Sequence, residues 1–174
     1  MKSDIIFYLR IFLITLIICT LCFTFYQSLL PPEQSSEVSE GVSDAIEPII
    51  PSDTPTGSYV HTNLRKIAHF VEFAALGLEV ALYVIFFLPA FSSSPRSKFK
   101  YIVHSYAAAP IVALLDETIQ VFTDRGPAIT DVWLDTAGFF SLATISYLVY
   151  LAVVFVRHRR QGISPRVPTD SQNG

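Results

Sequence analysis

Charged residues are scarce in this sequence, and that scarcity argues against an ordinary soluble domain. They make up 16% of the 174 residues, whereas 51% are hydrophobic and the mean hydropathy is +0.46. Soluble globular domains carry about 25% charged residues. The composition therefore predicts a protein whose main solvent is the lipid bilayer.

Cysteines and familiar enzyme motifs are also lacking. Cys19 and Cys22 lie three residues apart in an apolar run, so we expect no disulfide between them. The sequence has no nucleophile elbow, zinc-binding helix motif or phosphate-binding loop, so no motif identifies a reaction. The first apolar run is too long for a signal peptide and lacks a small-x-small cleavage site, so we expect it to remain as a membrane helix.

Four apolar stretches dominate what is present, at residues 5–30, 67–91, 101–122 and 132–156. A helix needs about 20 apolar residues to cross a bilayer, so the predicted fold class is an all-α polytopic membrane protein with four transmembrane helices. We divide the chain into a first transmembrane helix (1–30), an acidic, largely disordered extracytoplasmic loop (31–64), a three-helix core (65–156) and a basic cytoplasmic tail (157–174). The sequence does not decide whether residues 42–50 form a short surface helix within this loop.

The basic residues predict the orientation. With both termini on the cytoplasmic side, nine Lys and Arg residues lie inside and three, Arg65, Lys66 and Arg125, lie outside. Membrane proteins keep most of their Lys and Arg in cytoplasmic segments, so the sequence predicts an N-in, C-in topology. The inner basic clusters are typical of interfacial anchors, and we expect no nucleic-acid partner.

Polar residues of the last three spans gather at the outer membrane face. Lys66, His69 and Glu72 recur at three-residue spacing near the start of the second span, which places them on one helix face. The third span ends outside with an acidic pair and a glutamine, and the fourth begins there with two aspartates one turn apart. The predicted ligand-binding residues are Lys66, His69, Glu72, Asp116, Glu117, Gln120, Arg125, Asp131 and Asp135.

Acids outnumber bases in this layer, which favours a cation or a ligand that brings positive charge. Ionisable groups cost roughly 2.5–3.5 kcal/mol each in a membrane helix, so they usually face a bundle interior or a polar cavity. The candidate ligands of a divalent metal ion are Asp116, Asp131 and Asp135, and the candidate general bases are His69 and Glu117.

Two positions keep alternative interpretations. Asp131 follows Thr130 at a helix start, where capping and the helix dipole explain an acid as well as ligand binding does. Glu79 lies one heptad below Glu72, near mid-membrane, and fits either a buried hydrogen-bonded acid or the floor of a cavity.

The spacing of these residues resembles that of the VanZ-like family of bacterial membrane proteins. The resemblance covers roughly residues 64–155 and consists of Lys66-x-x-His69-Phe70-x-Glu72-Phe73-x-x-Leu76-Gly77, Asp116-Glu117-x-x-Gln120-x-Phe122, Arg125 and Asp131-Val132-x-x-Asp135-x-x-Gly138. The family is named for an accessory protein linked to teicoplanin resistance. The resemblance implies a multi-pass protein of the bacterial cytoplasmic membrane with a cell-envelope role, and it implies no reaction.

This sequence departs from the family pattern at two places. Thr123 and Asp124 stand where many members have Pro-Gly before the loop arginine. Leu142 stands where members often have a second glycine, so the pattern does not predict close helix approach at that point.

Two functions fit the sequence. The first is an accessory protein that binds an envelope lipid headgroup or a cell-wall precursor and influences glycopeptide susceptibility, with Lys66 and Arg125 on the phosphate. The second is a membrane-embedded, metal-assisted enzyme acting on a lipid-linked envelope substrate. The sequence favours the first, because a reaction needs site geometry that residue types alone do not give. Carboxyl oxygens that converge to metal-coordination distance favour the second.

Overall fold

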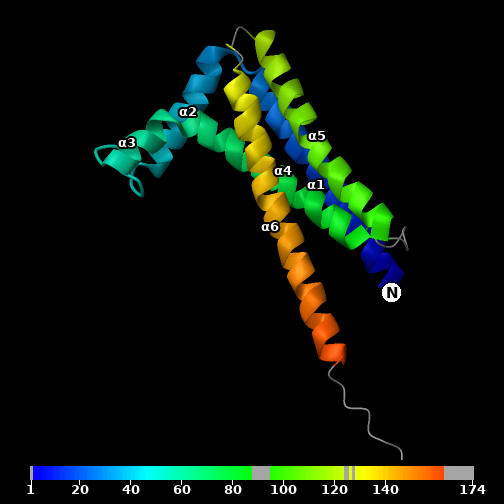
Figure 1. Cartoon of the computed structure of the whole chain (residues 1–174). Coiled ribbons are helices and arrows are strands. Elements are labelled where there is room, and N and C mark those ends of the chain that lie inside the picture. The colour runs from blue at the N-terminus through cyan, green and yellow to red at the C-terminus, as the bar shows by residue number, and fades with distance from the viewer. Residues whose placement is uncertain (1, 88–94, 124–125, 127, 163–174) are drawn as a thin grey trace, which may run out of the picture.

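The computed structural model describes residues 2–87, 95–123, 126 and 128–162, and the regular secondary structure within these ranges is helical (Figure 1). The helices are α1 (Lys2–Leu29), α2 (Pro32–Ile46), α3 (Pro55–Thr62), α4 (Leu64–Phe87), α5 (Pro95–Val121) and α6 (Ile129–Gly162). Arg125, one of the predicted site residues, lies outside the described residues.

Four of the helices are long and apolar enough to cross a membrane. Their candidate spans are Asp4–Leu29 in α1, Leu64–Phe87 in α4, Phe99–Val121 in α5 and Ile129–Arg157 in α6. Large apolar side chains stay exposed along them, as a bilayer environment requires. The predicted all-α fold with four transmembrane helices is therefore confirmed, while the N-in, C-in orientation stays a prediction.

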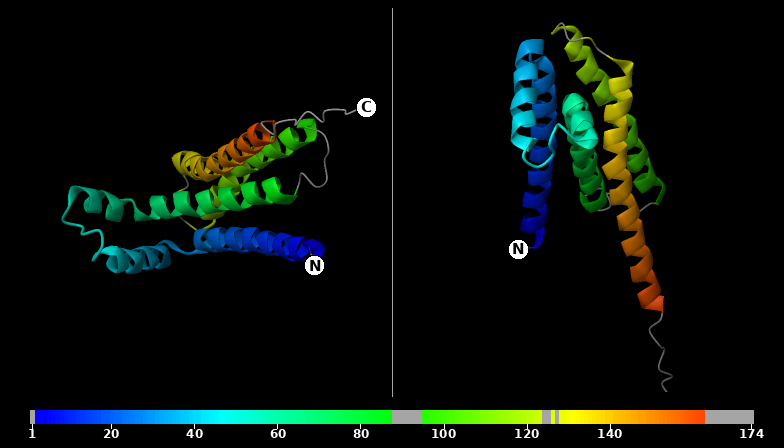
Figure 2. Two further views of the ribbon diagram at one scale, coloured as in Figure 1. Left: turned by 90° about the horizontal axis from the view of Figure 1, so that it is seen from below. Right: turned by 90° about the vertical axis from the view of Figure 1, so that its left-hand side faces the viewer.

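The four spans alternate in direction, and this brings polar residues together at one end of the bundle. The C-terminal ends of α1 and α5 lie near the N-terminal ends of α4 and α6 (Figure 1). The start of α1 and the end of α6 lie at the other end of the molecule, away from α2 and α3 (Figure 2). The predicted site residues come from the end that is next to α2 and α3.

Two glycines set the contact between α4 and α6. A Cβ atom on Gly77 would lie 2.2 Å from the carbonyl oxygen of Phe139, and one on Gly138 would lie 2.4 Å from the carbonyl oxygen of Phe70. Only glycine fits where two helix backbones approach so closely. Because Phe70 follows His69 directly, the contact at Gly138 also places His69 beside the first turns of α6.

Residues 31–64, which we expect from their composition to form a largely disordered loop, contain α2 and α3. The composition indicated disorder because apolar residues are few. Local signals nonetheless define the helices. Pro32 and Pro55 occupy first-turn positions, where the fixed φ of proline suits a helix, and Thr54 caps α3 by accepting a 3.0 Å hydrogen bond from the Gly57 N–H.

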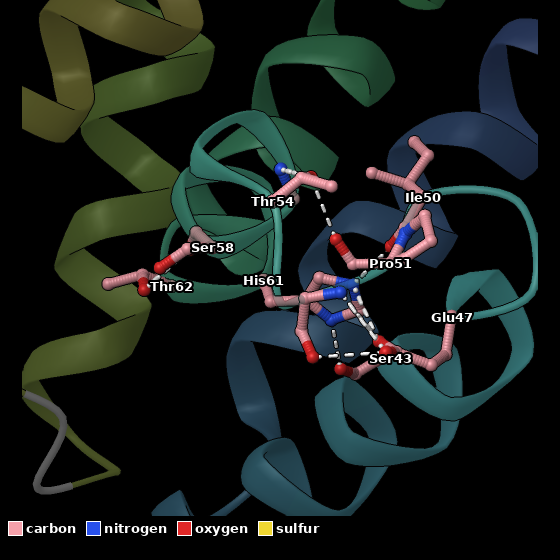
Figure 3. Close-up of polar contacts among 10 residues, drawn as sticks. Ser43, Glu47, Ile50, Pro51, Thr54, Ser58, His61 and Thr62 are labelled. Carbon is pink, nitrogen blue, oxygen red and sulfur yellow. Dashed lines mark hydrogen bonds and ion pairs between the residues drawn. The ribbon is translucent and has the colours of Figure 1, made fainter.

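His61 on α3 contacts the end of α2 and the turn that follows it through its two ring nitrogens (Figure 3). Its Nδ1 is hydrogen-bonded to the Ser43 hydroxyl, and its Nε2 lies 2.9 Å from the carbonyl oxygen of Ile50 and 3.2 Å from Oε2 of Glu47. One ring therefore ties together two helices and the turn between them, which a count of apolar residues does not reveal.

Candidate functional site

Three of the predicted site residues converge inside the bundle, one from each helix of the predicted three-helix core. His69 comes from α4, Asp116 from α5 and Asp135 from α6, and one donor atom of each lies within 4.8 Å of the others. Asp116 and Asp135 have no exposed surface, and the side chain of His69 is 12% exposed. We call these three residues the His–Asp cluster.

Asp116 is the best-anchored member of the His–Asp cluster. Its Oδ1 accepts a 2.6 Å hydrogen bond from the Ser28 hydroxyl at the end of α1, and its Oδ2 accepts one of 3.2 Å from the Gln120 amide. The same Oδ2 lies 3.6 Å from Nδ1 of His69. The carboxylate is thereby held in one orientation, with Oδ2 directed toward the histidine.

Gln120 connects the cluster to its charged surroundings. Its carbonyl oxygen accepts a 2.7 Å hydrogen bond from Arg65, while its amide nitrogen donates to both Asp116 and Glu117. Glu117 also accepts a 3.0 Å hydrogen bond from the backbone N–H of Ala128, just before α6. This network fixes both acids of the α5 end relative to α4 and α6.

Asp135 differs from these two acids. Both of its carboxyl oxygens are buried, and neither accepts a hydrogen bond from a residue that the structure describes. An ionised carboxylate in such a place is strongly unfavourable. The described surroundings of Asp135 therefore do not compensate the negative charge of an ionised carboxylate there.

Two cavities of different character adjoin the cluster. A groove of about 390 Å³ lies between α1, α2 and α4, with mostly apolar walls and with Arg65, His69 and Glu72 among its lining residues. A cavity of about 10 Å³ lies between α4, α5 and α6 and is lined by Arg65, Lys66, His69, Glu117, Asp131, Leu134 and Asp135. His69 and Arg65 line both, so they stand between the groove and the buried acids.

The remaining predicted residues lie around this centre. Glu72 borders the groove, where its side chain bonds to the Thr24 hydroxyl and its Oε2 is buried. Lys66 and Asp131 form an ion pair of 3.9 Å at the rim, with side chains 57% and 22% exposed. Glu79 lies deeper and accepts a 2.8 Å hydrogen bond from Thr20, which matches the interpretation as a buried hydrogen-bonded acid.

Sequence reasoning missed the contribution of α1. Thr20, Thr24 and Ser28 recur every four residues, which puts them on one helix face, and they contact Glu79, Glu72 and Asp116 in turn. A polar stripe of period four in an otherwise apolar span was the available signal. Arg65 was placed at the start of its helix but was not included in the predicted site.

The family profile described as VanZ/LLP1 matches residues 12–156, which is most of the chain. The chain belongs to the VanZ/LLP1 family. The matched region of this VanZ/LLP1 protein includes Ser28 on α1 as well as the His–Asp cluster, so it contains every helix that contributes to the site. Searches of curated proteins and of solved structures gave no match.

Proposed function

We propose that this VanZ/LLP1 protein is an accessory protein of the bacterial cell envelope, which binds a lipid headgroup or a lipid-linked cell-wall precursor and thereby influences susceptibility to glycopeptides of the teicoplanin type. The observation that carries the proposal is the groove between α1, α2 and α4. It combines apolar walls with charged residues at the polar end of a membrane bundle, as an amphiphilic ligand requires.

The lining of the groove includes apolar and polar side chains. Phe23 on α1, Val38 and Val42 on α2, and Val71 on α4 provide apolar surface for a lipid chain. The volume of about 390 Å³ falls in the range of roughly 300–1,000 Å³ found for small-molecule sites. The groove thus has room for a headgroup together with part of its chain.

In this proposal three side chains that line the groove contact the polar part of the ligand. Arg65 is exposed and offers a planar guanidinium to a phosphate, while Glu72 offers a carboxylate to a hydroxyl or an amine. His69 lies between the headgroup and the buried acids. Lys66, expected from the sequence to contact the phosphate, pairs with Asp131 at the rim, and in this proposal Arg65, which lines the groove, contacts the phosphate as well.

Filling the groove tests the proposal. Ala68 lines the groove and is exposed, so Ala68→Trp places an indole where the ligand binds. Ala137→Trp, at an exposed position of α6, is the matched control. In cells that depend on this protein for teicoplanin tolerance, Ala68→Trp should accumulate normally and restore susceptibility, whereas Ala137→Trp should change neither. An abundant and fully active Ala68→Trp protein contradicts the proposal.

A membrane-embedded, metal-assisted enzyme acting on a lipid-linked envelope substrate is the second candidate. The convergence of His69, Asp116 and Asp135 beside the groove favours it, with His69 or Glu117 as general base. The test is incubation of the purified full chain with a lipid-linked precursor, followed by mass spectrometry. A released headgroup that disappears in the Asp135→Asn variant, which lacks one carboxylate of the converging set, supports the enzyme, and an unchanged precursor rejects it.

A further inference from the structure

The His–Asp cluster lies in an environment of excess negative charge. Three further carboxylates, Glu72, Glu117 and Asp131, surround the two of the cluster, and the described part of the chain brings only two permanently cationic side chains, Arg65 and Lys66, to the same region. Lys66 is engaged with Asp131 at the exposed rim, and Arg65 donates to the Gln120 amide oxygen. Among the described residues, Arg65 and Lys66 therefore do not fully compensate the charge of the buried acids.

The Asp135 carboxylate is the group in the cluster that most needs a nearby positive charge. Its side chain is fully buried, and its two oxygens accept no hydrogen bond within the described ranges. One of these oxygens lies within 4.8 Å of donor atoms on His69 and Asp116, so the carboxylate is aimed into the cluster. A buried acceptor without a donor, facing a second carboxylate and an imidazole, is the arrangement that a metal cation completes.

We propose that His69, Asp116 and Asp135 bind a divalent metal ion of the Mn²⁺ or Zn²⁺ class. One imidazole nitrogen and two carboxylate oxygens suit these ions. Ligands on opposite sides of an ion with bonds of about 2.1 Å are about 4.2 Å apart, so small side-chain rotations close the observed spacing around it. This inference does not depend on the ligand of the groove.

The surroundings support such a site in two ways. The bonds from Ser28 and Gln120 fix the Asp116 carboxylate, as hydrogen bonds to metal-binding carboxylates commonly do. The cavity of about 10 Å³ beside His69 and Asp135 is about the size of one water molecule, which completes the coordination from the open side. Asp131, a candidate ligand from the sequence, is not among the three converging groups and pairs with Lys66.

Metal titration of the purified protein tests the inference. The full chain in detergent is treated with a chelator, and Mn²⁺ binding is followed through the electron paramagnetic resonance signal of free Mn²⁺. We expect one ion per chain, displaced one for one by Zn²⁺. Asp135→Asn and His69→Gln should each weaken Mn²⁺ binding at least about tenfold. Asp131→Asn removes the same charge at the rim, outside the three converging groups, and should weaken Mn²⁺ binding much less than either cluster variant.

Thermal unfolding separates loss of metal from loss of fold. Mn²⁺ should raise the melting temperature of the wild-type chain and of Asp131→Asn. The melting temperatures of Asp135→Asn and His69→Gln should be the same with and without Mn²⁺. Two cluster variants are included, so that if one folds poorly the other still tests metal binding. Folded wild-type protein that binds no Mn²⁺ or Zn²⁺, or equal loss of binding in Asp131→Asn and the cluster variants, overturns the inference.

Discussion

The Ser28 hydroxyl at the end of α1 donates a 2.6 Å hydrogen bond to Asp116 on α5, 88 residues further along the chain. Both side chains are fully buried. The bond makes α1 a part of the polar site as well as a membrane anchor. It also fixes Asp116 in the orientation that directs its other oxygen toward His69.

Removal of this bond should cost stability. Ser28→Ala leaves Oδ1 of Asp116 buried without that donor, so we expect the free energy of unfolding to fall by about 1–3 kcal/mol. The measurement is denaturant unfolding of the purified protein in detergent. Ser36→Ala is the control, because the Ser36 hydroxyl is exposed and donates to the Pro32 carbonyl oxygen of its own helix. Equal stability of the two variants argues against a structural role for the Ser28 bond.

The sequence predicted the helices of the bundle better than the contacts of α1. Hydropathy alone locates the four spans, since each is long and apolar. The spacing of Lys66, His69 and Glu72 places them on one face without any knowledge of neighbours. The polar stripe of Thr20, Thr24 and Ser28 becomes informative only when the packing partner of α1 is known, and a sequence does not supply that.

The same limit explains the different positions of the predicted acids. Asp131 and Asp135 lie one turn apart on α6, and both were candidate metal ligands. The closeness of α4 to α6 at Gly138 buries Asp135 completely and leaves Asp131 at the rim with Lys66. That distinction depends on a backbone contact between helices, which spacing along one helix does not encode.

This backbone contact gives the second prediction. Gly138→Leu introduces a side chain whose first carbon already meets the Phe70 carbonyl at 2.4 Å, so the helices must separate. We expect the amount of protein in the membrane to fall severalfold. Gly41→Leu on α2 is the control, because nothing lies within 4 Å of a Cβ atom there, and it should accumulate normally. Normal accumulation of Gly138→Leu contradicts the close approach of α4 and α6.

The third prediction concerns the orientation in the membrane, and the structure indicates which position on α3 accepts a cysteine label. Ser58 on α3 is exposed, whereas its neighbour Gly57 is buried, and a Cβ atom on Gly57 would lie 1.8 Å from the carbonyl oxygen of Pro51. A cysteine at Ser58 therefore reports accessibility without disturbing the turn before α3.

With the exposed Cys19 and Cys22 replaced by serine, Ser58→Cys should react with an impermeant thiol reagent in intact cells. Ser94→Cys and Ser164→Cys, at positions outside the described residues, should react only after permeabilisation. The expectation rests on the nine-to-three distribution of Lys and Arg residues. Labelling of Ser94→Cys in intact cells reverses the orientation and places the site on the cytoplasmic side.

The junction between α2 and α3 should loosen in acid, which is the fourth prediction. Hydrogen bonds from the Ser52 backbone and hydroxyl, together with nearby His61, lower the pKa of Glu47 from its ordinary value of 4.5. A lowered pKa means that Glu47 stabilises the folded junction above pH 4.5 and loses this effect as the pH falls through its folded pKa.

Distance distributions between spin labels at Ser36 and Thr56 measure this loosening. The distribution should broaden as the pH falls below 4.5 in the wild-type chain. Glu47→Gln cannot titrate, so its distribution should stay the same over this pH range. An equal broadening in both proteins assigns the effect to another group.

The final prediction separates function from folding at the His–Asp cluster, and the structure makes Asp135 the best position for it. Glu117→Gln removes a charge, but both Glu117 oxygens accept hydrogen bonds, from Gln120 and from Ala128. A glutamine has one acceptor oxygen, so one of these bonds is lost and about 1 kcal/mol of stability with it. Loss of activity in this variant could therefore come from the missing charge or from the lower stability.

Asp135→Asn avoids that ambiguity. The Asp135 oxygens accept no hydrogen bond from the part of the chain that the structure describes, so the amide disrupts none of the observed bonds and removes a buried charge. We expect a melting temperature without metal equal to or above that of the wild-type protein, normal membrane abundance and complete loss of any effect on teicoplanin susceptibility. An abundant and fully active Asp135→Asn protein excludes Asp135 from the function and leaves the cluster as a structural network. A poorly folded one instead means that the Asp135 carboxylate is needed for assembly of the bundle.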